Sequence, residues 1–168
     1  MAIAPTWFAR TRLGRSPVWA SVVALAIAVT QLSPAGAQTS SSGEVPIPDK
    51  PFAEHHLVLQ LSDGEQEKQA LVISVAYNLL KAYEPDKIAI EVVAFGPGID
   101  LLRAENRNRA RVDSLIAQGV QFDICMNTVD TLEREGKHVN INPKAVKVQV
   151  GVKRILELTE KGYELVRP

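Results

Sequence analysis

The chain has 168 residues, 46% of them hydrophobic, with 19 basic and 19 acidic side chains and a formal net charge of zero. This length fits one globular domain with a core of its own. The first 37 residues hold three arginines and no acidic residue, which leaves 16 basic against 19 acidic side chains in the remainder, a net charge of −3. That balance argues against nucleic acid as a partner.

The first 37 residues have the order of a secretory signal peptide. Arg10, Arg12 and Arg15 form a positive segment, residues 18–29 are apolar, and Ala35-Gly36-Ala37 fits a small-residue cleavage site. The alternative, an uncleaved anchor, is less well supported because the apolar run is short for a membrane span. We therefore expect cleavage after Ala37, Sec-type export to the periplasm or beyond the cell, and no membrane span in the mature chain.

Residues 38–54 are rich in Ser, Gly and Pro, which predicts a flexible linker with order beginning near His55. Residues 57–61 then form a nearly continuous apolar run, typical of a strand buried on both faces of a parallel sheet. Asp63 follows in a turn and is a candidate cap for the next helix, which we expect over residues 66–82. Pro85 stops that helix.

Strands and helices continue to alternate along the rest of the domain, residues 55–168. The expected elements are a strand over 88–95 that Gly96-Pro97-Gly98 ends, a helix over 100–118, a strand over 120–125, a helix over 128–134, a strand over 145–150, a helix over 152–159 and an edge strand over 163–166. This alternation predicts an α/β sandwich around a mostly parallel sheet.

Cys125 is the only cysteine and ends the third expected strand. A thiol between the carboxyl end of a strand and the amino end of a helix lies near unpaired backbone N–H groups, which favour the thiolate. Cys125 cannot form an intramolecular disulfide, and an unpaired thiol outside the cytoplasm is either buried and inert or retained for chemistry. A small buried hydrophobic side chain is therefore the alternative interpretation.

Binding sites of open parallel sheets form beyond the carboxyl ends of the strands. Three loops are expected to meet there, and they contain Asp63, the stretch Gly96-Pro97-Gly98, and Asn127 with Thr128. The second loop makes a shelf with few side chains beside the expected position of the thiol. Turn formation and helix capping are the ordinary alternative roles of these residues.

Two kinds of charged side chain bear on the thiol. Asp123 lies on the same strand face as Cys125, and its carboxylate would oppose formation of the thiolate. Arg103 or Arg107 could reach the sulfur, although arginines on a helix face are usually solvated. The chain has no G-x-G-x-x-G fingerprint and no His-x-x-x-His or Cys-x-x-Cys spacing, so we expect neither a cofactor nor a metal site.

Taken together, these segments resemble the DsrE/DsrF-like family of small sulfur-relay proteins, and its secreted single-cysteine members most closely. The resemblance spans residues 55–168 and is carried by Leu57–Leu61, Val93–Ile99, Gly119–Thr128, and Gly151-Val152 through Pro168. It implies a three-layer α/β/α fold around a five-stranded sheet and a homo-oligomer built from trimers. Relay members carry sulfur as a persulfide on a cysteine in the region that matches Cys125.

The resulting hypothesis is a periplasmic sulfur-handling protein that binds or relays sulfane sulfur on Cys125. The Gly96–Gly98 shelf and the backbone amides near Asn127 would stabilise the persulfide anion. Two alternatives stay open: a non-catalytic module that binds a small ligand or a protein in the same cleft, and a redox-sensing thiol. The cytoplasmic sulfurtransferase partners of the family do not carry over to an exported chain, so the sulfur donor and acceptor are open.

Overall fold

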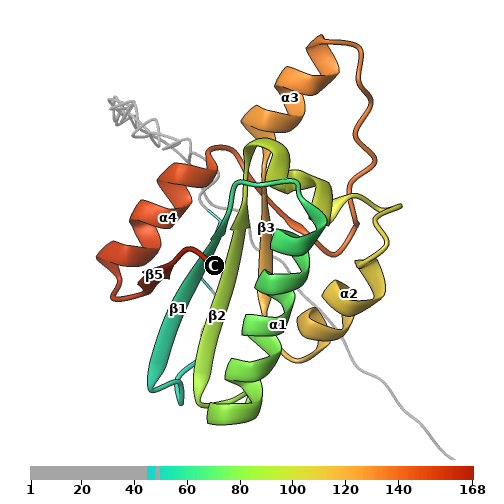
Figure 1. Ribbon diagram of the computed structural model, residues 1–168. Coiled ribbons are helices and arrows are strands. Elements are labelled where there is room, and N and C mark those ends of the chain that lie inside the picture. The colour runs from blue at the N-terminus through green and yellow to red at the C-terminus, as the bar shows by residue number, and fades with distance from the viewer. Residues whose placement is uncertain (1–44, 48–49) are drawn as a thin grey trace, which may run out of the picture. The chain divides into compact units, whose positions relative to one another are not determined.

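The computed structural model describes residues 45–47 and 50–168, so the predicted leader and its cleavage site lie outside the described part of the chain. Strands and helices alternate from His55 onward (Figure 1). The elements are β1 (His55–Leu61), α1 (Gln66–Tyr83), β2 (Ile88–Ala94), the 3₁₀ helix η1 (Gly96–Leu102), α2 (Arg109–Ala117), β3 (Gln121–Cys125), α3 (Met126–Arg134), β4 (Val146–Val148), α4 (Gly151–Glu160) and β5 (Glu164–Val166).

The five strands form one sheet in the order β4-β3-β2-β1-β5, and all four pairings are parallel. β2 lies at the centre and is buried along its whole length, which explains why its sequence is almost continuously apolar. Because every strand points the same way, all the carboxyl ends meet at one edge of the sheet. The sequence-based prediction of a mostly parallel five-stranded sheet is confirmed.

Helices cover both faces of the sheet, which confirms the three-layer arrangement. Helices α1 and α2 lie on one side and α4 on the other (Figure 1). The larger core lies under α1 and α2, where Val72 and Ile73 pack with strand residues such as Val92. A smaller core lies under α4, where Ile155 and Leu158 pack with the opposite strand face.

The prediction of one helix over residues 100–118 is wrong for the first half of that range. Instead, η1 begins at Gly96 with Pro97 in its first turn, and α2 begins only at Arg109. Asn106 interrupts the helix, because its side-chain amide donates to the backbone oxygen of Asp100 at 2.9 Å and its carbonyl accepts the N–H of Asn108 at 2.8 Å. Such side-chain bonds compete with the helical backbone ladder.

Ordered contacts begin earlier than His55, within the segment expected to be a flexible linker. The ammonium group of Lys50 donates to the backbone oxygens of Pro85 and Ile88, each at 3.1 Å. Farther upstream, Nη1 of Arg154 donates to the backbone oxygen of Val45 at 2.6 Å. Val45–Ile47 and the residues from Lys50 onward therefore lie against the domain.

Candidate functional site

Cys125 stands where two helices begin. It is the last residue of β3 and the N-cap of α3, and β4 next to β3 leads into α4. The first residue of α4, Gly151, donates its backbone N–H to Sγ of Cys125 at 3.3 Å. The sulfur also lies 3.8 Å from the backbone oxygen of Gln149, which can accept the thiol proton. The amino end of α4 therefore donates to the sulfur of the residue that precedes α3.

The absence of a side chain at residue 151 makes this contact possible. A Cβ atom there would lie 3.2 Å from Cβ of Cys125 and 3.3 Å from Cβ of Phe95. These distances are tighter than ordinary van der Waals contact. Gly151 was not among the candidate site residues that the sequence predicted, although a glycine shortly after the strand next to β3 is a usable signal.

The thiol is covered from outside. Cys125 is 5% exposed, and the neighbouring Gln149 is bonded to α3. The backbone oxygen of Gln149 accepts the N–H of Asn127 at 3.1 Å, and the side-chain amide of Gln149 donates to Oδ1 of Asn127 at 2.8 Å. Gln149 therefore links the end of β4 to the start of α3 beside a buried thiol.

The backbone amides expected to stabilise an anion on sulfur have other partners. The N–H of Gly96 donates to Oγ1 of Thr128 at 3.0 Å, and the N–H of Gly98 donates to the backbone oxygen of Phe95 at 3.1 Å. The amide of Asn127 is used by Gln149. Gly151, and not the Gly96–Gly98 shelf or Asn127, is the residue whose backbone N–H donates to the sulfur.

Two of the predicted residues have local structural roles. Gly98 packs against β1, because a Cβ atom at this position would lie 2.2 Å from the backbone oxygen of Leu61. Asp63 does not cap α1, whose N-cap is Glu65. The Asp63 carboxylate instead accepts the N–H of Glu65 at 2.9 Å and closes the turn before the helix.

The three predicted loops do meet beyond the carboxyl edge, and they line an open cleft of about 670 Å³ between η1 and α3. Gly64, Gly96, Pro97, Asn127 and Thr128 are among its lining residues. Cys125 is not, because its side chain lies on the α4 side of the sheet, where it contacts Gly151. The cleft and the thiol are therefore two separate features of the same edge.

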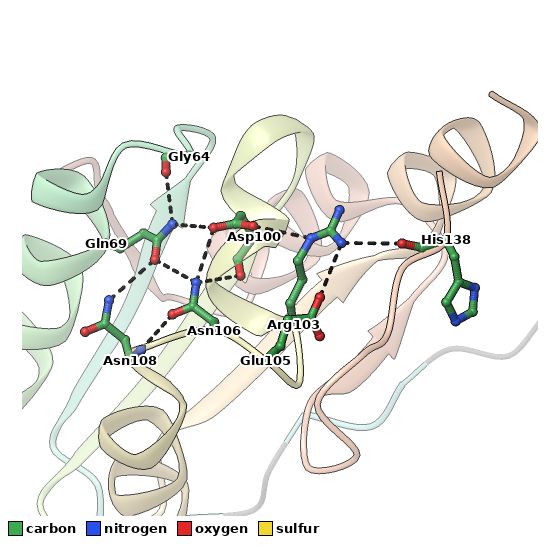
Figure 2. Close-up of polar contacts among 8 residues, drawn as sticks. All are labelled: Gly64, Gln69, Asp100, Arg103, Glu105, Asn106, Asn108 and His138. Carbon is green, nitrogen blue, oxygen red and sulfur yellow. Dashed lines mark hydrogen bonds and ion pairs between the residues drawn. The ribbon is translucent and has the colours of Figure 1, made fainter. Parts of the chain in front are cut away.

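A polar network fixes the rim of this cleft, as Figure 2 shows. The fully buried side chain of Gln69 on α1 donates to the backbone oxygen of Gly64 at 3.0 Å and to Oδ2 of Asp100 at 3.1 Å. Asn106 donates to the same Oδ2 at 3.2 Å and to Oε1 of Gln69 at 3.1 Å. The network joins α1, η1 and the loop before α2.

Arg103 extends from this network into the cleft. Its Nε lies 3.3 Å from Oδ1 of Asp100, and its Nη1 lies 3.6 Å from the exposed Glu105 carboxylate and 3.4 Å from the backbone oxygen of His138. Arg107 bonds to Gln66 instead. Both arginines have partners other than Cys125 in the described structure, so the expectation that one of them reaches the thiolate finds no support.

A buried charge cluster lies on the α4 side, and sequence reasoning missed it as a unit. Arg154 of α4 contacts two carboxylates through Nε, with Oε1 of Glu91 at 2.5 Å and Oδ2 of Asp123 at 3.3 Å. All three side chains are at most 2% exposed. Two acidic residues therefore share one cation away from water, a costly arrangement if both are ionised.

Burial raises the pKa of Asp123 to about 9, and the hydrogen bond to Glu91 and its negative charge add to the effect. Asp123 is therefore protonated at neutral pH. Oε2 of Glu91 is buried and has no donor among nitrogen and hydroxyl groups, and the protonated Asp123 carboxyl shares a hydrogen bond with the Glu91 side chain. Asp123 thus interacts with Glu91 and Arg154, although the sequence suggested that its carboxylate would lie near the thiol and oppose formation of the thiolate.

Metal-binding and membrane-spanning features are absent from the part of the chain that the structure describes. Within residues 45–47 and 50–168, no three His, Cys, Asp or Glu side chains gather in a way that could hold a metal ion. No helix in the same ranges combines the length and apolar character needed to cross a bilayer.

Comparison with known proteins supports the fold and supplies no activity. No family model matches the chain, and no curated protein matches it. Among solved structures it is similar to a protein of unknown function, MTH1491, from Methanobacterium thermoautotrophicum, at 28% sequence identity and a TM-score of 0.62. The match covers 68% of this chain and 100% of that one, so this chain has the α/β fold of a structure whose function is itself unknown.

Proposed function

We propose that this protein handles sulfane sulfur in the periplasm, accepting a sulfur atom on Cys125 as a persulfide and passing it to another thiol. The observation that carries the proposal is the N–H of Gly151, which is aimed at Sγ of Cys125 from 3.3 Å. An N–H donor at a helix amino end is suited to hold negative charge on sulfur. The resemblance to sulfur-relay proteins supplies the class of substrate.

The transfer is an exchange between sulfur atoms and needs no added oxidant. The Cys125 thiolate attacks the terminal sulfur of a persulfide or polysulfide, the sulfur–sulfur bond of the donor breaks, and the remaining sulfur chain leaves with the electron pair. In the second step an acceptor thiolate attacks the outer sulfur, and Cys125 leaves as a thiolate. Each step forms one sulfur–sulfur bond and breaks one.

Intact-mass spectrometry tests the first step. After incubation with inorganic polysulfide, the protein should gain the mass of one sulfur atom, about 32 Da. Cys125→Ser should gain nothing, while its unfolding curve in urea stays close to that of the parent. A parent protein that gains no sulfur contradicts the proposal.

Exposure to peroxide separates sulfur handling from redox sensing. A redox-sensing thiol gains oxygen or forms a mixed disulfide under peroxide and is indifferent to polysulfide. A protein that responds in this way is a redox sensor, and the sulfur-handling proposal then falls.

A further inference from the structure

We propose that the cleft between η1 and α3 is a second binding site, which takes a small organic carboxylate with an apolar body. The site is independent of the chemistry proposed for Cys125, because the thiol does not line the cleft. Its volume of about 670 Å³ lies within the range of pockets that hold small molecules.

The walls of the cleft fit an apolar body. Pro97 and Ile99 come from η1, and Leu132 faces them from α3. Gly64 and Gly96 add backbone without side chains, so a flat ligand can approach that wall closely. Surfaces of this kind bind carbon rings or short chains by excluding water.

The polar end of the site is Arg103, and its position is fixed before any ligand arrives. Asp100 holds Nε of Arg103 at 3.3 Å, while Gln69 and Asn106 hold the other oxygen of Asp100 at 3.1 and 3.2 Å. Because Gln69 is fully buried, this support comes from the core of the domain. A preorganised guanidinium loses little freedom when it binds an anion.

Part of the Arg103 guanidinium is free. Nε and Nη1 have protein acceptors, and Figure 2 shows the remaining terminal nitrogen without a contact, pointing away from Glu105. Arg103 lines the cleft, and its side chain is 24% exposed. One terminal nitrogen of the guanidinium is thus available to a carboxylate at the end of an apolar slot.

The neighbouring acidic groups favour a ligand with a single negative charge. Asp100 is occupied by Arg103 and two amides. Glu105 lies 3.6 Å from Nη1 and is exposed, so it competes with an incoming anion for the same guanidinium. A dianion such as phosphate would meet two carboxylates with only one cation to balance it, whereas a monocarboxylate meets less repulsion.

Titration of the full chain with benzoate, followed by ¹H–¹⁵N NMR, tests the site. Benzoate should shift the Arg103 side-chain N–H signal and the amides of Thr128 and Leu132. Benzamide, which has the same ring without the charge, and acetate, which has the charge without the ring, should each bind far more weakly. Equal binding of benzoate and benzamide, or no shift at these residues, would overturn the proposal.

Two variants of opposite expected effect sharpen this test. Arg103→Gln should weaken benzoate binding by about tenfold, the effect of one charge-assisted hydrogen bond. Glu105→Gln removes the competing carboxylate and should strengthen binding by about twofold, as expected for an exposed ion pair. Arg107→Gln is the matched control, because Arg107 is exposed and bonds to Gln66 outside the cleft. Unchanged binding in both Arg103→Gln and Glu105→Gln contradicts the assignment of Arg103.

Discussion

Replacing Asp123 with Asn should remove a pH dependence from the stability of the fold. Burial and the neighbouring Glu91 raise the pKa of Asp123 from 3.8 to about 9 in the folded protein. The groups that face it are Glu91 from β2, Gln121 from its own strand and Arg154 from α4. The folded state therefore holds one proton more than the unfolded state between about pH 4 and about pH 9.

The sign and size of the effect follow from this extra proton. The stability contributed by protonated Asp123 is fully present below about pH 4 and is lost as the pH rises toward about 9. Within that window the loss is about 1.4 kcal/mol per pH unit, which is about 2.7 kcal/mol between about pH 6 and about pH 8. Asn carries no titrating proton and can still donate to Glu91, so Asp123→Asn should lose this slope.

Urea unfolding of the two proteins at both pH values measures the effect. The free energy of unfolding of the parent should fall relative to Asp123→Asn by about 2.7 kcal/mol from about pH 6 to about pH 8. Asp86→Asn, a change at an exposed carboxylate, should follow the parent. A parent-minus-variant difference that does not change with pH would refute the reasoning, because Asp123 would then be ionised in the folded state.

Four further predictions concern the charge cluster, the packing at β1, the cleavage site and the assembly. Arg154→Met leaves Glu91 buried without its cation and should lower the free energy of unfolding by about 3–5 kcal/mol, measured in urea beside the exposed control Arg111→Met. Gly98→Ala should lower the free energy of unfolding by about 3 kcal/mol, because the new Cβ would lie 2.2 Å from the backbone oxygen of Leu61. A variant as stable as the parent would show that the backbone of β1 shifts at little energetic cost. Intact mass should show that the chain recovered from the periplasm begins after Ala37. Light scattering should show a trimer-based oligomer, and a monomer at high protein concentration would argue against that assembly.

The sequence predicts the sheet well because strands that are buried on both faces consist almost entirely of apolar residues. β2 is buried on both faces, and the run of residues 88–95, apolar except for Glu91, admits few other interpretations. Helix α1 is equally well defined by its apolar spacing and by the proline beyond it. These elements depend on local pattern and need no knowledge of their neighbours.

The contacts that define the candidate sites could not be predicted in this way. Gly151 reaches the sulfur of Cys125 only because β4 adds next to β3 and brings the start of α4 alongside. Likewise, Asp123 meets Glu91 and Arg154 through strand register and helix docking. Residue spacing along the chain does not specify either contact, so sequence reasoning placed Asp123 against the thiol.

The middle of the chain was mispredicted for a local reason. Residues 100–118 contain enough apolar positions to suggest one helix, but the side chain of Asn106 takes over backbone partners of the helix. The same side chain then holds Asp100, and through it Arg103. The break in the helix is thus also what builds the rim of the cleft.

Release of the carried sulfur tests the central claim most directly. Protein loaded with inorganic polysulfide and freed of excess reagent should react with cyanide to give one thiocyanate per chain, as expected of a single persulfide on Cys125. Cys125→Ser treated in the same way should give none. Loaded parent protein that releases no thiocyanate and keeps a free, alkylatable thiol would contradict the account, because Cys125 would then be only a buried, packed side chain.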